Sequence, residues 1–255
     1  MDYKNILTHV SEKTCFITIN RPKFLNSLNN ETISELSNCI KSINSDNNIK
    51  SAIITGAENK SFVAGADIKE FKPLNRDEGY ELSKKGHETL FNLIESSNKP
   101  FIAAINGFAL GGGLELAMAC HIRVASENAM LGLPEVTLGV IPGYGGTQRL
   151  PHLVGKGLAM EMILTGKMIN AKQALSHGLI NYMCIQDELI NECIKIANKI
   201  NSNSSEAVSR AIKAINACYQ ERKDGLVRLF DCENPHKAVI FCRTKDTTEM
   251  LSQMF

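Results

Sequence analysis

The sequence predicts an α/β fold in which strands alternate with helices, followed by a helical C-terminal region. Short runs of apolar and β-branched residues recur along the chain, and each leads through a polar or glycine-rich turn to a segment with helical spacing. From about residue 196 strand-like runs become rare. The chain has 255 residues, 44% of them hydrophobic, which is enough apolar material for one large core.

The elements can be taken in chain order as strand, turn and helix. We expect strands at 15–19, 50–56, 100–105 and 122–126, and helices at 31–43, 68–71, 114–120 and 147–155. A further helix is expected near 79–96, with one apolar face made by Leu82, Leu90, Leu93 and Ile94. The units share a plan without a fixed sequence period. The Asn/Ser-rich segment before residue 206 is either a hinge or a helix start capped by Ser204 or Ser205.

Composition excludes several classes of protein. Lys and Arg number 28 against 27 for Asp and Glu, so we expect neither nucleic acid nor an anionic membrane surface as a partner. The eight cysteines are scattered without metal-site or small-domain spacing, which indicates reduced thiols. The N-terminus lacks a secretory pattern, and Asn106 and Glu115 interrupt the longest apolar region. We therefore expect a cytoplasmic protein without a membrane span.

The stretch "GFALGGGLELAMAC", residues 107–120, places three glycines before a helix and Glu115 inside its first turn. Glycines leave the main chain open to close approach, and the first amides of a helix stabilise an anion in front of them. Tight packing of the helix against a strand explains the glycines equally well. Glu115 either stabilises the helix dipole or performs chemistry, and its apolar neighbours favour chemistry because a buried carboxylate needs a partner or a use.

Glu135 is a second carboxylate in apolar surroundings, between Pro134 and Val136 and ahead of the glycines at 143, 145 and 146. Two acids in such surroundings suit proton transfer, because different environments let one act as base and the other as acid. The sequence does not say whether Glu115 and Glu135 meet in space or are unrelated.

A third small-residue turn, "FVAGADIKEF", contains Ala64, Gly65 and Ala66 before Asp67. Asp67 is suited to cap the helix that follows. Two turns with bare main chain on adjacent units can each supply one N–H to a single carbonyl oxygen, which is the geometry of an oxyanion hole.

Other templates do not fit. The sequence contains no P-loop, no dinucleotide-binding glycine motif and no G-x-S-x-G elbow. The six histidines lack metal-ligand spacing, so we expect no metal site.

Four stretches, "NRPKFLNSLN", "SFVAGADIKEF", "PFIAAINGFALGGGLELAMACHIRVAS" and "LGLPEVTLGVIPGYGGTQRLPHLVG" with its continuation to residue 180, together resemble the enoyl-CoA hydratase (crotonase) family. The resemblance is collinear over about residues 15–185 and continues weakly beyond. It implies a crotonase-like spiral of ββα units at 1–195, a helical region at 196–255 for oligomerisation and as a lid, and a homotrimer or homohexamer.

The resemblance also assigns residues. Glu115 and Glu135 match the two catalytic glutamates, and the amides of Ala66 and Gly112 match the oxyanion hole. The acyl-CoA substrate would be bound by Lys23, Leu25, Ala64, Ala66, Asp67, Ile68, Lys69, Gly112, Pro134 and Gly143. Coenzyme A is part of the substrate, and no further cofactor is implied.

The implied activity is that of a lyase, the reversible hydration of a short or medium 2-trans-enoyl-CoA to 3-hydroxyacyl-CoA, as in fatty-acid β-oxidation or butyrate-type metabolism. Isomerisation or branched-chain hydration of an acyl-CoA is the alternative, and a non-catalytic acyl-CoA binder is a third reading. Two departures from the family bear on CoA binding: Phe24 replaces a small residue in the first turn, and Met250 stands where glycine is frequent in a C-terminus that lacks the usual basic tail.

Overall fold

The computed structural model describes residues 3–67, 70 and 75–230 of the chain. Residues 1–213 form one compact unit and 214–255 a second. Of the second unit the structure describes residues 214–230, which are the end of helix α9 (Ser205–Phe230). The predicted boundary after residue 195 falls inside helix α8 (Leu189–Asn201), and the functional division between 1–195 and 196–255 stays a prediction.

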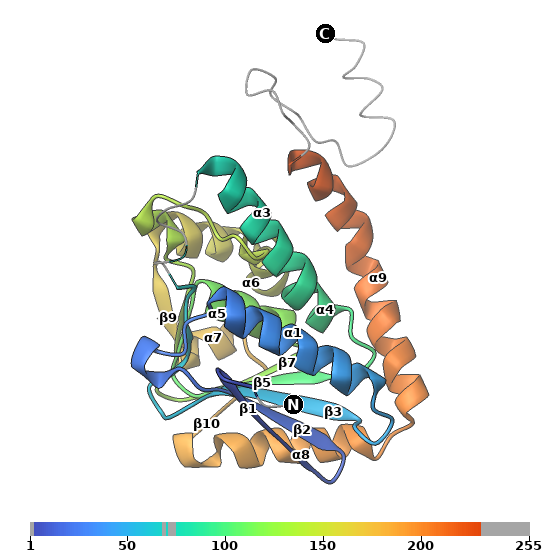
Figure 1. Cartoon of the computed structure of the whole chain (residues 1–255). Helices are drawn as coiled ribbons and strands as arrows, with labels where there is room; N and C mark the ends of the chain where they lie inside the picture. The colour runs from blue at the N-terminus through green and yellow to red at the C-terminus, as the bar shows by residue number, and fades with distance from the viewer. Residues whose placement is uncertain (1–2, 68–69, 71–74, 231–255) are drawn as a thin grey trace. The chain divides into compact units, whose positions relative to one another are not determined.

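The first unit contains a six-stranded sheet, which lies beside its covering helices in Figure 1. Its strands, in spatial order, are β1 (Ile6–Ser11), β2 (Thr14–Ile19), β3 (Ser51–Gly56), β5 (Phe101–Ile105), β7 (Ile122–Ser126) and β10 (Tyr182–Cys184). The first two strands form an antiparallel hairpin, and every later neighbour is parallel. The four predicted strands are the four central ones, whose residues are mostly buried and β-branched or small.

A second sheet of four short strands carries the turns that matter for function. Its strands, in spatial order, are β4 (Ser61–Ala64), β6 (Phe108–Leu110), β8 (Met130–Gly132) and β9 (Met168–Asn170). Strands β3, β5 and β7 of the large sheet are each followed in the chain by a strand of the small sheet and then by a helix. This ββα alternation confirms the predicted fold class, and it stacks the turns after β4, β6 and β8 at one edge, because these strands are parallel neighbours.

The large sheet is covered on both faces because its side chains alternate. Ile53, Ile102 and Val124 pack against α8, together with Leu189 and Cys193 of that helix. Their sequence neighbours face the main core on the other side, which includes α1 (Asn30–Ser45). Figure 1 shows α8 and α1 on opposite sides of the sheet. Burial on both faces explains the continuous apolar runs of these strands.

The remaining helical segments complete the first unit. They are α3 (Arg76–Gly86), a π turn (His87–Phe91), α4 (Asn92–Glu95), α5 (Gly112–Ala119), α6 (Gly146–Thr165) and α7 (Ala171–Ser176), with 3₁₀ turns at η1 (Pro22–Phe24), η3 (Glu135–Leu138) and η4 (Gln186–Glu188). The helix predicted near 79–96 is therefore α3, the π turn and α4 in succession. Leu90 and Ile94 are fully buried, as the apolar face predicts. Ser204 caps α9, since its Oγ accepts from the Ala207 amide at 3.4 Å.

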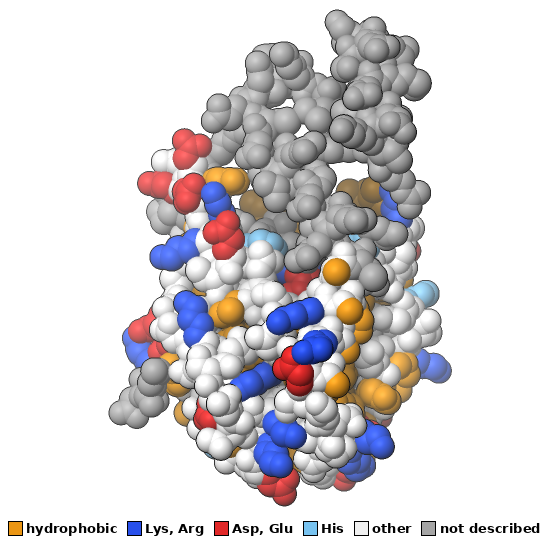
Figure 2. All heavy atoms as spheres, turned by 90° about the vertical axis from the view of Figure 1, so that its right-hand side faces the viewer, with side chains coloured by type: hydrophobic (Ala, Val, Ile, Leu, Met, Phe, Trp, Pro, Cys, Tyr) orange, Lys and Arg blue, Asp and Glu red, His pale blue; other side chains and the backbone are white. Residues whose placement is uncertain are grey.

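The surface carries mixed charge. On the face shown in Figure 2, Lys and Arg side chains lie among acidic, hydrophobic and uncharged ones, which agrees with a net charge of +1. Among the residues that the structure describes, no helix combines the length and hydrophobicity of a membrane span. Met250 and the other C-terminal features noted above lie outside the described residues.

Candidate active site

Gly111 precedes α5 and Gly112 and Gly113 begin it, and each of the three has a different physical explanation. Gly111 adopts φ +51°, a conformation that side chains with a Cβ resist. A Cβ on Gly113 would overlap the carbonyl of Val63 in β4, so this glycine lets the helix pack against a strand. Gly112 has room for a Cβ, whose nearest neighbours would be the Tyr144 ring at 3.5 Å and the Ala66 amide nitrogen at 3.6 Å. Packing thus explains Gly113, while Gly112 is buried beside the Tyr144 ring and the Ala66 amide without a steric need for glycine.

The amides of Ala66 and Gly112 lie side by side at the edge of the small sheet. The amide of Gly112 is the first of α5 and has no partner within the helix. Among the described residues neither amide donates to a backbone acceptor, although the flanking amides of Asp67 and Gly111 do, to Leu28 and Gly132. Two unpaired N–H groups that flank one small space are suited to bind a negatively charged oxygen.

Glu115 is completely enclosed, with a side chain 1% exposed. Its Oε1 accepts hydrogen bonds from the amides of Tyr144 at 2.8 Å and Gly146 at 2.7 Å. Burial raises the pKa of Glu115 to about 7, and the negative charge of Glu135 adds to the rise, while the two amides oppose it. The carboxylate therefore exchanges its proton near neutral pH and is held in one orientation.

Glu135 begins η3, directly after Pro134. It is half-buried, and burial raises its pKa to about 7 as well. Its Oε2 is enclosed and has no hydrogen-bond partner among the described residues, and a Cβ on Gly111 would lie 3.1 Å from its Oε1. The structure thus brings Glu135, the glycine turn and Glu115 together, which the sequence left open.

A buried aromatic pair forms the wall beside these groups. The ring of Tyr144 stacks on Phe91 with centroids 4.5 Å apart and planes 12° apart, and it touches the space in front of Gly112. Burial raises the pKa of the Tyr144 phenol, and the charges of Glu115 and Glu70 add to this. The sequence analysis missed Tyr144, although an aromatic residue inside the glycine cluster "PGYGG" is an unusual feature that could have indicated it.

The predicted substrate-binding residues of the first turn lie against the segment that carries Ala66. The Ala64 amide donates to Leu25 at 3.1 Å, and an isolated bridge pairs Leu28 with Ala66. Lys23 is exposed in η1. These contacts make the first turn and the 64–67 segment one continuous surface beside the two free amides.

Asp67 accepts a hydrogen bond from Arg21 Nη2 at 3.1 Å. The helix that Asp67 was expected to cap, and the predicted substrate-binding residues Ile68 and Lys69, lie outside the described residues. Phe24 is 50% exposed and lies under the Arg21 guanidinium, 4.8 Å from its ring centroid. Two predicted substrate-binding residues remain. Pro134 directly precedes Glu135, and the carbonyl of Gly143 accepts a hydrogen bond from Ser83 Oγ of α3.

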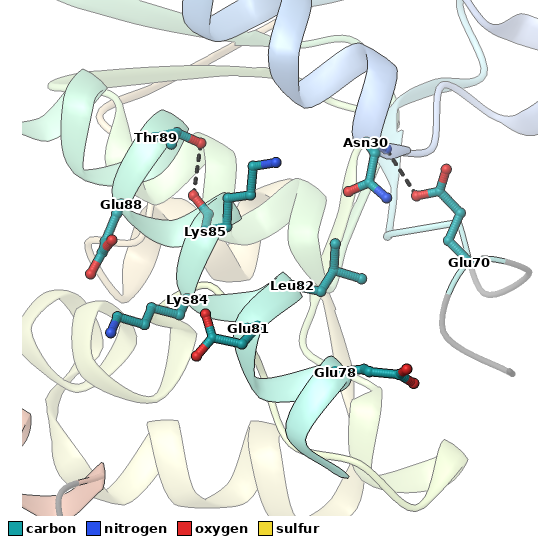
Figure 3. A pocket seen from close by; sticks show the side chains of 9 residues that line it. All are labelled: Asn30, Glu70, Glu78, Glu81, Leu82, Lys84, Lys85, Glu88 and Thr89. Atoms are coloured by element: carbon teal, nitrogen blue, oxygen red, sulfur yellow. Dashed lines mark hydrogen bonds between the residues drawn. The ribbon is translucent and has the colours of Figure 1, made fainter. Parts of the chain in front are cut away.

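A separate pocket of about 660 Å³ lies between the start of α1 and α3 (Figure 3). Four glutamates and two lysines line it, and within it Glu70 accepts a hydrogen bond from the first amide of α1, that of Asn30, at 2.9 Å. Neither Glu115 nor Glu135 borders this pocket, and its charged lining differs from the enclosed site around Glu115. The two carboxyl groups of raised pKa therefore lie outside this pocket, beside the glycine turns.

The chain is similar to several known proteins over most of its length. A family model described as enoyl-CoA hydratase/isomerase matches residues 9–239. The chain is 49% identical over 216 residues to the short-chain-enoyl-CoA hydratase of Clostridium acetobutylicum, covering 85% of this chain and 82% of that protein. It is 47% identical over 216 residues to the crotonyl-CoA hydratase of Syntrophomonas wolfei, with 85% and 83% covered.

Solved structures show the same similarity. The crystal structure of an enoyl-CoA hydratase from Bacillus anthracis superposes with a TM-score of 0.81 at 39% identity, covering 98% of this chain and 96% of that one.

Proposed function

This chain belongs to the enoyl-CoA hydratase/isomerase family, and we propose that Glu115, Glu135 and the amides of Ala66 and Gly112 carry out its reaction. The chain is an enzyme, a hydro-lyase that adds water across the double bond of a 2-trans-enoyl-CoA to give 3-hydroxyacyl-CoA. The observation that carries the assignment of residues is the meeting of two carboxylates of raised pKa with two amides that have no backbone acceptor within the described part of the chain.

The chemistry follows from the charges that the reaction creates. The oxygen of water bonds to the β-carbon, the π electrons of the double bond move toward the thioester, and negative charge collects on the thioester oxygen. The amides of Ala66 and Gly112 would stabilise this oxygen, and losing one such donor typically costs about 3 to 4 kcal/mol of transition-state stabilisation. The α-carbon then takes a proton as the charge returns from the oxygen.

The surroundings of the two glutamates assign their roles. The two carboxyl groups titrate in the same range of pH, but two amides of other residues donate to Glu115 Oε1, and the positive charge of Arg149 also favours its ionised form. Glu115 is then the base that takes a proton from water. Glu135 is bonded by its own backbone amide, while its Oε2 is unpartnered among the described residues, and we assign it as the acid that protonates the α-carbon. The proton gained by Glu115 balances the one lost by Glu135.

The wall of the site supports a short acyl chain. The Tyr144 ring is 4% exposed, stacked on Phe91, and directly beside Gly112. An acyl chain whose thioester oxygen sits at Gly112 therefore meets a rigid aromatic surface. We propose crotonyl-CoA and its near homologues as substrates, which agrees with the names of the two relatives described above.

Self-association is supported by the apolar surface beside Glu135. Leu138, Val140 and Ile141 are 60%, 56% and 65% exposed, and Leu164 at the end of α6 is 67% exposed. These segments meet where the Cβ position of Gly166 lies against Thr137. Exposed apolar groups that lie close together favour an interface between subunits. We propose a homotrimer or homohexamer, with sedimentation of the purified protein as the test.

Location and cofactor use complete the proposal. Cys15, Cys39, Cys120, Cys184 and Cys193 are free thiols, which suits a reducing cytoplasm. The two carboxylates and two amides supply every proton transfer and charge contact that hydration requires, so we propose no cofactor beyond the coenzyme A of the substrate.

One experiment tests the function. Purified protein is incubated with crotonyl-CoA, and loss of the conjugated enoyl thioester absorbance is followed. We expect turnover that declines as the acyl chain is lengthened from four to ten carbons. Absence of turnover with every chain length rejects the proposal. Conversion of a 3-enoyl-CoA without hydration of crotonyl-CoA would favour isomerisation instead, and preference for a methyl-branched substrate would favour branched-chain hydration.

A further inference from the structure

Arg149 is a buried cation at the N-terminal end of a helix. It lies in the first turn of α6, where the helix dipole presents positive charge, and it is 6% exposed. Its Nε is enclosed without a hydrogen-bond partner among the described residues. Burial, the helix dipole and an unsatisfied donor each cost free energy, so the position must bring a compensating benefit.

The guanidinium bonds the turn that holds the catalytic base. Arg149 Nη1 donates to the carbonyl oxygen of Tyr144 at 2.7 Å. The backbone N–H of Tyr144 donates a hydrogen bond to Glu115, as does the backbone N–H of Gly146. The Tyr144 carbonyl belongs to the peptide between Tyr144 and Gly145, which lies between the two peptides whose N–H groups converge on Glu115, so fixing it anchors the turn that carries both donors.

Gly145 makes this contact possible. It adopts φ +90°, which a side chain with a Cβ would strain. A Cβ there would also collide with Arg149 Nη1 and would lie 2.8 Å from His87 Cε1. The glycine at position 145, in the middle of the 144–146 turn, is thus explained by the close approach of the Arg149 guanidinium to the main chain.

The other nitrogen of the guanidinium is anchored to α4. Arg149 Nη2 donates to Glu95 Oε2 at 2.9 Å and to Asn92 Oδ1 at 3.2 Å. These two acceptors orient the planar guanidinium group so that Nη1 faces the Tyr144 carbonyl. A planar fork can satisfy both sides at once, which a lysine ammonium cannot do in the same geometry.

The charges around Arg149 leave Glu115 available as a base. Among ion pairs within the described residues, Arg149 pairs with Glu95 and not with Glu115. Its positive charge still favours the ionised form of Glu115. Besides Glu95 and Glu115, His87 lies near the guanidinium, and the Cys120 thiol lies within range of its charge. Glu115 itself faces Glu135 and Tyr144.

We propose that Arg149 is a positioning residue for hydration: its guanidinium links α4 to the Tyr144 carbonyl and thereby keeps the 144–146 amides aimed at Glu115. The inference rests on the proposed function of Glu115 as base. It differs from a purely structural role, in which Arg149 only ties α6 to α4.

The test compares Arg149→Lys and Arg149→Met with wild type in the full chain, using crotonyl-CoA. Misplacing a catalytic group by about 1 Å costs on the order of 100-fold, so we expect kcat to fall by about that factor in Arg149→Met and by less in Arg149→Lys, with KM nearly unchanged. The acidic limb of the kcat/KM profile should move to higher pH in Arg149→Met, because the positive charge that favours the Glu115 anion is lost. It should move less in Arg149→Lys, which keeps the charge.

Arg123→Lys is the matched control. Arg123 is also 6% exposed, and its guanidinium donates to the carbonyls of Leu179 and Cys120, away from the two glutamates. We expect it to lower the melting temperature while leaving kcat and the pH profile as in wild type. If Arg149→Met does not fold, the kcat of Arg149→Lys relative to wild type decides whether the proposal holds.

Two results overturn the proposal: wild-type kcat and pH profile in the folded Arg149 variants, or a loss in Arg123→Lys equal to that in Arg149→Lys. Failure of the proposed function is distinct from either, since wild type itself would then be inactive.

Discussion

Glu115 and Glu135 have pKa values that burial raises to about 7, yet they stand in different surroundings. Glu115 lies in the first turn of α5, fully enclosed, with one oxygen fixed by two amides. Glu135 lies in a 3₁₀ turn beside exposed apolar side chains, and one of its oxygens has no partner among the described residues. Burial therefore brings both groups to titrate in the same range of pH, whereas hydrogen bonds from two amides hold only Glu115 in a fixed position.

The largest effect is expected from Glu115→Gln. Glutamine keeps an oxygen that accepts both amides, so the fold should persist while the base is lost. General base catalysis is worth about 10² to 10⁴, and we expect kcat for crotonyl-CoA to fall by about 10³-fold or more with little change in KM. Glu127→Gln, at an exposed position, is the control. An active Glu115→Gln enzyme would contradict the role of Glu115.

Glu135→Gln should cost less, about 10²-fold in kcat, because solvent can partly replace a proton donor that the protein does not fix. Glu135→Asp should retain more activity than Glu115→Asp, since only Glu115 depends on a fixed pair of amides. Steady-state kinetics on all the variants measures the difference. Equal losses at the two positions would remove the distinction between a fixed and an adjustable carboxylate.

The comparison also predicts stability against pH. The pKa of Glu115 is about 7 in the folded chain, above the value of about 4.3 in unfolded chains, so the folded state binds this proton more tightly. Its contribution to stability is complete below about pH 4 and is lost as the pH rises through 7. At pH 8 the wild type must ionise a buried carboxylate, and Glu115→Gln should be more stable by on the order of 2 to 3 kcal/mol.

Urea unfolding at pH 4 and pH 8 checks this expectation, and the gain should vanish at pH 4. Glu135→Gln should show a smaller gain because Glu135 is only half-buried. A larger gain in the free energy of unfolding from Glu135→Gln than from Glu115→Gln would contradict the conclusion that Glu115 is the more deeply buried of the two.

A smaller effect is expected from Gly146→Ala. The new Cβ would lie 2.9 Å from Glu115 Oε1 and 3.0 Å from Leu133 Cδ1, so the carboxylate must shift. We expect kcat to fall by roughly 10-fold, less than a 1 Å displacement would cause. Gly157→Ala in the same helix is the control, because nothing lies within 4 Å of its Cβ position. An unchanged kcat in Gly146→Ala would show that Glu115 tolerates displacement.

Much of the large sheet could be predicted from sequence, because β3, β5 and β7 are short apolar runs bounded by turns. The small sheet could not, since β6, β8 and β9 are only three residues long and show no period. The edge strand β1 was also missed. Only Ile6 of its six residues is buried, so its side chains do not alternate between core and solvent.

The site was predictable as residue types and not as an arrangement. Glu115 was expected to be buried because its neighbours are apolar, and it is. Its meeting with Glu135 depends on the parallel pairing of β6 with β8, which neither local sequence reveals. Arg149 was missed because its burial results from α4 and the 144–146 turn closing around it, and an arginine in a helix ordinarily indicates a solvated face.

The hydrogen bonds of Glu115 reach 29 and 31 residues along the chain, and those of Arg149 to α4 reach 54 and 57. Contacts of such separation form late, because the intervening loops must close before the contacts offset the lost entropy. The helices and the sheet hairpin form from nearer neighbours. We therefore expect a refolding chain to recover its far-ultraviolet circular dichroism before its hydratase activity, so that a nearly folded molecule is still chemically inert.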